Sequence, residues 1–253
     1  MRKHIFLIFL VTAFGLIFAQ DKQNDSKLFL IHQDQVYPYM FEKYESALKN
    51  FSDLLEQNSI DDMSFSVVQQ EYFTYSAVIP VSDYNGLAKH FGMSNEMINK
   101  IGKENFNKAL KMFDGCYDKH KNFLLRLRKD LSYLPEYGLS PENGLNFRHF
   151  DYLYVIPGKE KEMMGILKEW KDLYTKHGVK QGYRVYIGDL GTDMPMVLLV
   201  TPSKNRVFWA MESDKIDEEL GGEQKSLLKR TFAITQKFEH KNGSMRPDLS
   251  QTK

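Results

Sequence analysis

The chain has 253 residues, which is enough for one large domain or two small ones. With 42% hydrophobic and 26% charged residues it has the composition of an ordinary globular protein, which argues against extended disorder. The net charge of +1 excludes a nucleic-acid-binding protein that depends on a concentrated basic surface. Cys116 is the only cysteine, so no internal disulfide is possible and packing must hold the fold together.

The first residues have the order of charge and hydropathy that is typical of a secretory signal peptide. Arg2 and Lys3 form a basic start, residues 5–18 are an almost continuous apolar run, and Ala19 offers a small residue for cleavage. The run is shorter than the ~20 apolar residues that a membrane-spanning helix needs. We therefore expect cleavage, export to the periplasm or beyond, and no stable membrane span afterwards. An uncleaved N-terminal anchor is the alternative.

Similar residues recur in the same order in the two halves of the chain, at a spacing of about 119 residues that drifts slightly, which indicates an internal duplication. Near the end of each half, residues 128–132 (RKDLS) match residues 246–250 (RPDLS). Four further identical pairs fall in the first predicted helix of each half: Leu48 and Leu167, Lys49 and Lys168, Asp53 and Asp172, Leu54 and Leu173. Chance can produce any one of these matches, but it is a poor explanation for all of them in the same order.

Hydrophobic periodicity predicts the same succession of elements in both halves. In the first half we expect a strand, a helix, two strands and further helical stretches, over residues 28–37, 38–57, 63–69, 72–80 and 93–128. In the second half we expect the corresponding elements over residues 147–156, 159–176, 182–187, 194–201 and from there to about 237.

This order predicts an α+β fold of two tandem ferredoxin-like (βαββαβ) repeats. Each sheet has helices on one face only, so two copies can cover each other's open faces as an internal pseudo-dimeric barrel. The helical stretch 93–128 is an insertion in the first repeat, which we expect to cap one end of the barrel. The predicted parts are a signal peptide (1–19), a polar segment (20–27), the first repeat (28–134), a linker (135–146) and the second repeat (147–250).

The second half resembles the dimeric α+β-barrel superfamily. A strand that ends in the sequence of residues 154–160 (YVIPGKE) and leads into an amphipathic helix, here with LKEW at 167–170, is frequent in that superfamily. The ending at residues 246–250 is similar to NIPSNAP-like and related secreted proteins. The resemblance implies the fold, and the superfamily includes haem-degrading and quinone-forming monooxygenases, chlorite dismutase-like proteins and many members without an assigned activity.

Two short patterns place polar side chains on the predicted first strands. His32 and Asp34 in the first half, and His149 and Asp151 in the second, are two residues apart, so each pair shares one face of its strand. Polar groups on an otherwise apolar face must find partners or water. We interpret the pairs as a polar patch in the barrel cavity that binds a ligand or transfers a proton. Structural hydrogen bonds near the strand ends are the alternative.

Tyr183 and Arg184 lie on the second predicted strand of the second half, where they could hold an anionic group. An edge or surface arginine is the alternative. The sequence contains no strong catalytic signature, and we predict no catalytic residue. The seven histidines show no close ligand spacing apart from the His-x-Asp pairs, so we predict neither a metal nor a cofactor.

These features favour an exported, non-enzymatic binding or accessory protein with a cavity between its sheets for a small apolar or aromatic ligand. We expect no nucleic-acid partner. Two alternatives remain: a barrel-type monooxygenase or oxidase that acts on an aromatic or haem-like ligand, and a structural module whose insertion docks a partner. The aromatic content of 13% suits a flat ligand, but also an ordinary core. The sequence determines neither the ligand nor the oligomeric state.

The predicted signal peptide can be tested by intact-mass spectrometry of the protein from the cell envelope. We expect a mature chain that begins at Gln20, because the basic, apolar and small-residue order of the first 19 residues directs cleavage after Ala19. A mature chain that still begins at Met1 would contradict the prediction.

Overall fold

The computed structural model describes residues 26–60, 63–135 and 144–252, so the predicted signal peptide, most of the polar segment and most of the linker lie outside the described residues. The first half of the chain forms four strands and three α-helices. In chain order they are β1 (Ser26–Val36), the 3₁₀ turn η1 (Pro38–Met40), α1 (Phe41–Gln57), β2 (Ser66–Gln70), β3 (Thr74–Val81), α2 (Tyr84–Ile101), α3 (Lys103–Lys111) and β4 (Tyr117–Arg128).

The second half has four strands and two α-helices. They are β5 (Phe147–Val155), α4 (Glu160–His177), β6 (Arg184–Gly188), β7 (Met196–Ser203), α5 (Arg206–Ala233), β8 (Thr235–Met245) and the 3₁₀ turn η3 (Pro247–Leu249). No helix in the described part of the chain is long and apolar enough to cross a membrane.

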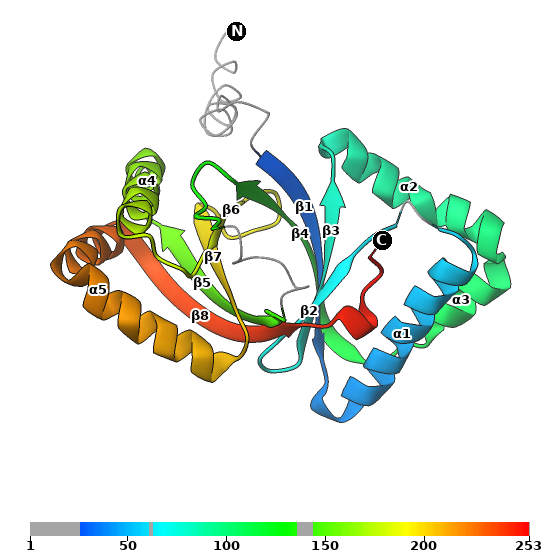
Figure 1. Ribbon diagram of the computed structural model, residues 1–253. Helices are drawn as coiled ribbons and strands as arrows, with labels where there is room; N and C mark the ends of the chain where they lie inside the picture. Colours follow the sequence, from blue (N-terminus) through cyan, green and yellow to red (C-terminus); the bar gives the residue numbers. More distant parts are fainter. Residues whose placement is uncertain (1–25, 61–62, 136–143, 253) are drawn as a thin grey trace, which may run out of the picture.

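The eight strands form one closed antiparallel barrel in the order β1-β3-β2-β8-β5-β7-β6-β4 (Figure 1). The order is β4-β1-β3-β2 within the first half and β8-β5-β7-β6 within the second. The halves meet at two antiparallel seams, where β2 pairs with β8 and β4 pairs with β6. The prediction of an α+β barrel is therefore confirmed.

The prediction that residues 93–128 are helical throughout is wrong for the last part, which forms β4. This strand pairs with β1 over nearly its whole length, from Ser26 opposite Arg128 to Val36 opposite Tyr117. Its first half is polar and exposed on both faces, so it lacks the apolar alternation that marks a strand in sequence. The edge of β1 supplies the backbone hydrogen bonds that make it a strand. The second half likewise ends in a strand, β8, which begins at Thr235 within the stretch predicted as helical.

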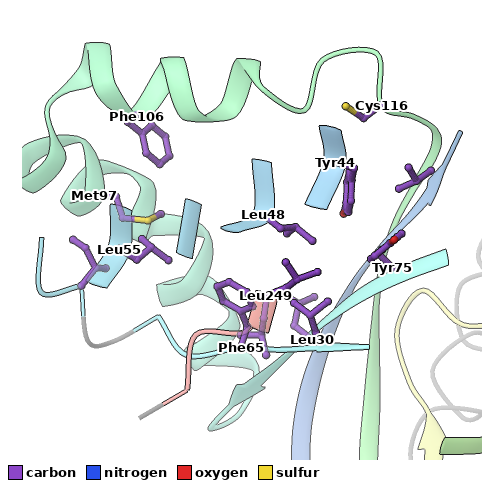
Figure 2. Packing of buried hydrophobic residues seen from close by; sticks show 14 of the residues in the cluster. Leu30, Tyr44, Leu48, Leu55, Phe65, Tyr75, Met97, Phe106, Cys116 and Leu249 are labelled. Carbon is purple, nitrogen blue, oxygen red and sulfur yellow. The ribbon is translucent and has the colours of Figure 1, made fainter. Parts of the chain in front are cut away.

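Helices α1, α2 and α3 cover the outer face of the first half (Figure 1). The predicted apolar stripe of α1 faces the sheet, with Leu48 and Leu55 buried against Leu30 (Figure 2). Met97 of α2 and Phe106 of α3 join the same apolar cluster. The helical insertion therefore packs on the outer face of the sheet beside α1, and not over one end of the barrel as predicted.

A separate apolar cluster occupies the inside of the barrel. Ile31, Leu125 and Phe150, from β1, β4 and β5, are buried together there with side chains of β2 and β7. The neighbours of Ile31 along its strand, Leu30 and His32, point the other way, because successive side chains of a strand alternate between its faces. The inner face of β1 is therefore apolar at Ile31, and His32 lies on the outer face.

The two Arg-x-Asp-Leu-Ser segments each dock on the opposite half of the molecule. Leu249, at the end of the second half, is buried in the core of the first half, and Leu131, at the end of the first, is buried in the core of the second. The Ser250 hydroxyl accepts from the backbone N–H of Val67 at 2.8 Å, and the Ser132 hydroxyl accepts from that of Val185 at 2.9 Å. The halves are therefore joined by two exchanged arms as well as by their seams.

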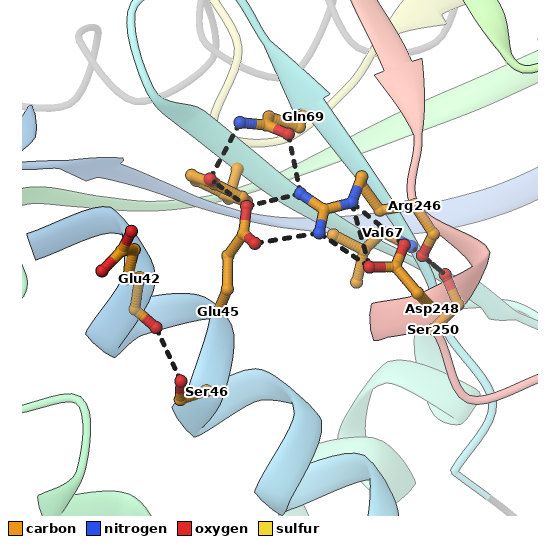
Figure 3. Close-up of polar contacts among 9 residues, drawn as sticks. Glu42, Glu45, Ser46, Val67, Gln69, Arg246, Asp248 and Ser250 are labelled. Carbon is orange, nitrogen blue, oxygen red and sulfur yellow. Dashed lines mark hydrogen bonds and ion pairs between the residues drawn. The ribbon is translucent and has the colours of Figure 1, made fainter.

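An arginine stiffens each arm. Arg246 binds Asp248 within its own arm at 2.7 Å and reaches Glu45 of α1 and Gln69 of β2 at 2.9 and 2.8 Å (Figure 3). The hydrogen bond from Arg246 holds the pKa of Glu45 below its usual range. In the other arm, Arg128 makes a bidentate pair with Asp130 at 2.8 and 2.7 Å. Bidentate pairs of this kind fix geometry as well as charge.

The exchanged arms predict that a residue close to the C-terminus contributes strongly to stability. We expect Leu249→Ala to lower the free energy of unfolding by about 2–5 kcal/mol, because it removes a buried side chain and leaves a cavity in the opposite half. Urea unfolding followed by circular dichroism measures the change. Leu190→Ala is the control, since Leu190 is 64% exposed and its loss should cost less than about 0.5 kcal/mol. Equal losses in the two variants would show that the arm is not part of the core.

Candidate functional site

The predicted His-Asp pairs lie on the outer, helix-covered face of the barrel. On β1, Leu30 and Val36 pack in the outer core of the first half, and His32 and Asp34 share their face. On β5, Leu153 and Val155 pack in the outer core of the second half, and His149 and Asp151 share their face. The interpretation of these pairs as a patch in the barrel cavity is corrected: they face the helices, because Ile31 of β1 and Phe150 of β5 are buried inside the barrel and set which face of each strand points inward.

Strand pairing brings two further polar residues to His32 and Asp34. In the β1–β4 ladder His32 lies opposite Asn122 and Asp34 lies opposite His120. Directly opposite residues of an antiparallel pair share a face, so all four side chains meet. We call the residues His32, Asp34, His120 and Asn122 cluster 1.

Asp34 is the centre of cluster 1. Its carboxylate is only 4% exposed and accepts from Nδ1 of His120 at 2.7 Å and from the hydroxyl of Tyr44 at 2.7 Å. Nε2 of His32 lies 3.8 Å from the same carboxylate. Burial and the negative charge of Asp34 raise the pKa of Tyr44, so this hydroxyl stays a donor. Helix α1 thus fixes the carboxylate from one side while β4 approaches it from the other.

Asn122 orients both imidazoles. Its amide oxygen accepts from Nδ1 of His32 at 3.0 Å, and its NH₂ donates to Nε2 of His120 at 3.3 Å. This arrangement places the proton of neutral His32 on Nδ1 and leaves a lone pair on Nε2. Burial lowers the pKa of His32; the charge of Asp34 opposes this effect and His120 reinforces it. The net effect is a lowered pKa, which favours the neutral imidazole.

The two imidazoles of cluster 1 are accessible from outside. The side chains of His32 and His120 are 41% and 38% exposed, and their rings meet edge to face with centroids 4.2 Å apart. Tyr117 flanks His120 at 5.8 Å. Cluster 1 therefore combines a buried carboxylate, one imidazole base at Nε2 of His32, and a second exposed imidazole whose nitrogens bind Asp34 and Asn122.

The second half contains the same four residue types in the same register. In the β5–β8 ladder His149 lies opposite Asn242 and Asp151 lies opposite His240. We call these residues cluster 2. His149 binds Asn242 at 2.9 Å and Asp151 at 3.1 Å, and the ring of Trp209 from α5 stacks on it at 3.9 Å.

Cluster 2 differs from cluster 1 in how its last histidine is placed. The rings of His149 and His240 are 5.9 Å apart, and the Asn242 amide donates to Glu71. Burial opposes the charged form of His149, but the hydrogen bond and charge of Asp151 outweigh it, so the pKa of His149 is raised. His32 and His149 occupy equivalent positions, but the pKa is lowered for His32 and raised for His149.

Tyr183 and Arg184 do not form one site. Tyr183 is buried in the outer core of the second half, and burial raises its pKa. Arg184 pairs with Val200, whose side chain belongs to the cluster inside the barrel, so Arg184 lies on the inner face. There it is near Arg148, and burial together with the charge of Arg184 lowers the pKa of Arg148 to about 10. The predicted anion site shared by Tyr183 and Arg184 is therefore not assembled.

Four residues of the clusters were not identified from sequence: His120, Asn122, His240 and Asn242. A signal for them exists, because residues 120–122 and 240–242 both have the sequence HKN. The sequence alone does not align the two tripeptides with each other, because residues 120–122 are predicted to be helical.

A surface hollow of about 720 Å³ lies between α4 and α5 and contains none of the predicted site residues. Four of its five charged lining residues pair with each other, Arg230 with Glu169 and Lys176 with Glu223. We therefore regard cluster 1 as the better candidate site.

No protein-family model matches the sequence, and no curated protein matches it. Solved structures of dimeric α+β-barrel proteins share the fold. An anthrone oxidase-like protein is 14% identical, with a TM-score of 0.56 over 91% of this chain and 96% of that chain. A protein from Lactobacillus acidophilus whose name proposes a monooxygenase is 8% identical, with a TM-score of 0.53 over 90% and 96%. A chlorite dismutase from Candidatus Nitrospira defluvii is 10% identical, with a TM-score of 0.50 over 88% and 92%.

These matches contradict the expectation of a non-enzymatic binding or accessory protein. The proteins that share the fold over nearly their whole length are named as an oxidase-like protein, a monooxygenase and a chlorite dismutase. The sequence contains no catalytic motif that indicates such an activity.

The raised pKa of His149 predicts a pH-dependent effect of Asp151→Asn. A histidine whose pKa is raised by folding stabilises the folded state fully at pH values below its unfolded pKa of 6.5. It loses that contribution as the pH rises through its folded pKa. The variant should therefore lose more stability at about pH 5.5 than at about pH 8. Urea unfolding at both pH values measures the difference, with Asp53→Asn as an exposed control. A loss that is larger at the higher pH would contradict the assignment.

Proposed function

We propose that the protein is an oxidase or monooxygenase that acts on an aromatic or similarly flat substrate, and that cluster 1 is its reaction centre. The names of proteins that share the fold support the reaction class. The observation that carries the proposal is the meeting of two exposed imidazoles, His32 and His120, on the buried carboxylate of Asp34.

Oxidation of an organic substrate by O₂ transfers electrons to oxygen and releases protons from the substrate, so the reaction centre needs a group that accepts protons and groups that orient the substrate. The lone pair on Nε2 of His32 and the imidazole of His120 point into the space beside Asp34. Asp34 is held by Tyr44, and both rings are held by Asn122, so the set is preorganised.

Aromatic rings around cluster 1 support a flat substrate. Tyr117 contacts the ring of His120, and Phe91 of α2, which is 58% exposed, contacts His90. Burial lowers the pKa of His90, and the charge of nearby His32 lowers it further. Exposed rings of this kind offer stacking surface for an aromatic substrate.

Two further properties belong to the proposal. Export is supported by the order of residues 1–19, which would place the reaction outside the cytoplasm. Duplication of a ferredoxin-like unit is supported by the equal strand order of the halves and by the equal registers of clusters 1 and 2. A closer relation to NIPSNAP-like proteins rests on the sequence of residues 246–250 alone.

The proposed function is tested by oxygen uptake with a panel of hydroxylated polycyclic aromatic compounds. We expect uptake with at least one of them, and a fall in rate of about 100-fold or more for Asp34→Asn, because the carboxylate orients the reacting groups. His240→Gln, at the equivalent position of cluster 2, is the matched control and should retain the rate within about 2-fold. Uptake that does not depend on Asp34, or no uptake with any compound, would contradict the proposal.

A further inference from the structure

We propose that cluster 1 binds a divalent transition-metal ion through Nε2 of His32, Nδ1 of His120 and the carboxylate of Asp34. The sequence predicts no metal, because the ligands come from β1 and β4 and show no ligand spacing along the chain. The inference names the ion at the proposed reaction centre, so its role rests on the proposed function. Binding of the ion is tested independently of that function.

The three ligand atoms are already gathered. They all lie within 4.8 Å of one another, with 2.7 Å between Nδ1 of His120 and Asp34 Oδ1 and 3.8 Å between Nε2 of His32 and Asp34 Oδ2. Bonds from an ion to imidazole nitrogen and carboxylate oxygen are about 2.0–2.2 Å, which places two ligands of one ion roughly 3–4 Å apart. Small side-chain rotations therefore suffice to bring the three atoms onto one ion.

Second contacts hold two of the three ligands, His32 and Asp34, in place, as is usual around metal ions. Asn122 accepts from Nδ1 of His32 and so directs the Nε2 lone pair toward the space shared with Asp34. Tyr44 donates to Asp34 and fixes the carboxylate. When the ion binds, His120 changes tautomer, because an imidazole nitrogen binds a metal only through its lone pair. Its proton moves by way of solvent from Nδ1 to Nε2, so the NH₂ of Asn122 turns away from Nε2.

The ligand chemistry selects the class of ion. Two imidazoles and one carboxylate suit Zn²⁺, Fe²⁺ and similar ions, whereas Ca²⁺ and Mg²⁺ prefer oxygen ligands alone. Three protein ligands leave at least one coordination position for substrate or water. The 41% and 38% exposure of His32 and His120 makes that position reachable from outside.

Cluster 2 serves as an internal comparison. It has the same residue types, but Asp151 occupies Nε2 of His149, Trp209 covers the ring, and the two histidine rings are 5.9 Å apart instead of 4.2 Å. Among the described residues, only the first-half triad brings three ligand atoms of this kind together. We therefore expect one ion per chain and not two.

The test is a calorimetric titration of the purified, untagged and chelator-treated protein with Zn²⁺, repeated with Co²⁺, whose absorption spectrum reports imidazole ligands. We expect one equivalent to bind. His120→Ala should weaken binding at least about 100-fold, and Asn122→Ala about 10- to 100-fold, as is typical for a residue that holds a ligand. His240→Ala, the matched change in cluster 2, should leave the affinity unchanged. Circular dichroism of the metal-free variants confirms that each is folded.

No stoichiometric binding, or equal weakening by His120→Ala and His240→Ala in folded protein, would overturn the inference. The outcomes are separable from the proposed function. One bound ion without oxygen uptake supports the metal site and contradicts the oxidase activity. Oxygen uptake by protein that binds no metal supports the activity and overturns the metal site.

Discussion

Antiparallel pairing of β2 with β8 and of β4 with β6 closes the sheet on itself, and the rest of the structure depends on this closure. Each half alone would expose two strand edges and one apolar sheet face to water. Closure pairs all the edges and buries both inner faces in one apolar cluster. The exchanged arms strengthen the same junction, since Leu131 and Leu249 each complete the core of the opposite half. Neither half is therefore complete without the other.

The filling of the barrel determines where chemistry can take place. Because Ile31 of β1 and Phe150 of β5 are buried inside the barrel, the residues next to them in their strands, His32, His149 and Asp151, are directed toward the helices. There each covering helix supplies a contact. The hydroxyl of Tyr44 in α1 donates to Asp34, and the ring of Trp209 in α5 stacks on His149. The candidate site lies between sheet and helices as a consequence of packing inside the barrel.

The two clusters show how one backbone register supports different chemistry. In both, a His-x-Asp strand faces a His-x-Asn strand. In cluster 1 the asparagine bridges two histidines and leaves their rings exposed. In cluster 2 the NH₂ of Asn242 donates to Glu71, and the ring of Trp209 covers His149. The difference arises from the covering helices and from the neighbouring half, and not from the strands that carry the residues.

The sequence by itself determined the apolar stripes of the helices, most of the strands and the pairing of His32 with Asp34 and of His149 with Asp151 on one face, because these depend on local periodicity. Only the tertiary structure decided which face that is, and that polar residues 117–122 form a strand. Periodicity shows that a face is buried, but not against what. The contact between His32 and Asn122 joins residues 90 positions apart, and it exists because β1 needs a partner along its free edge.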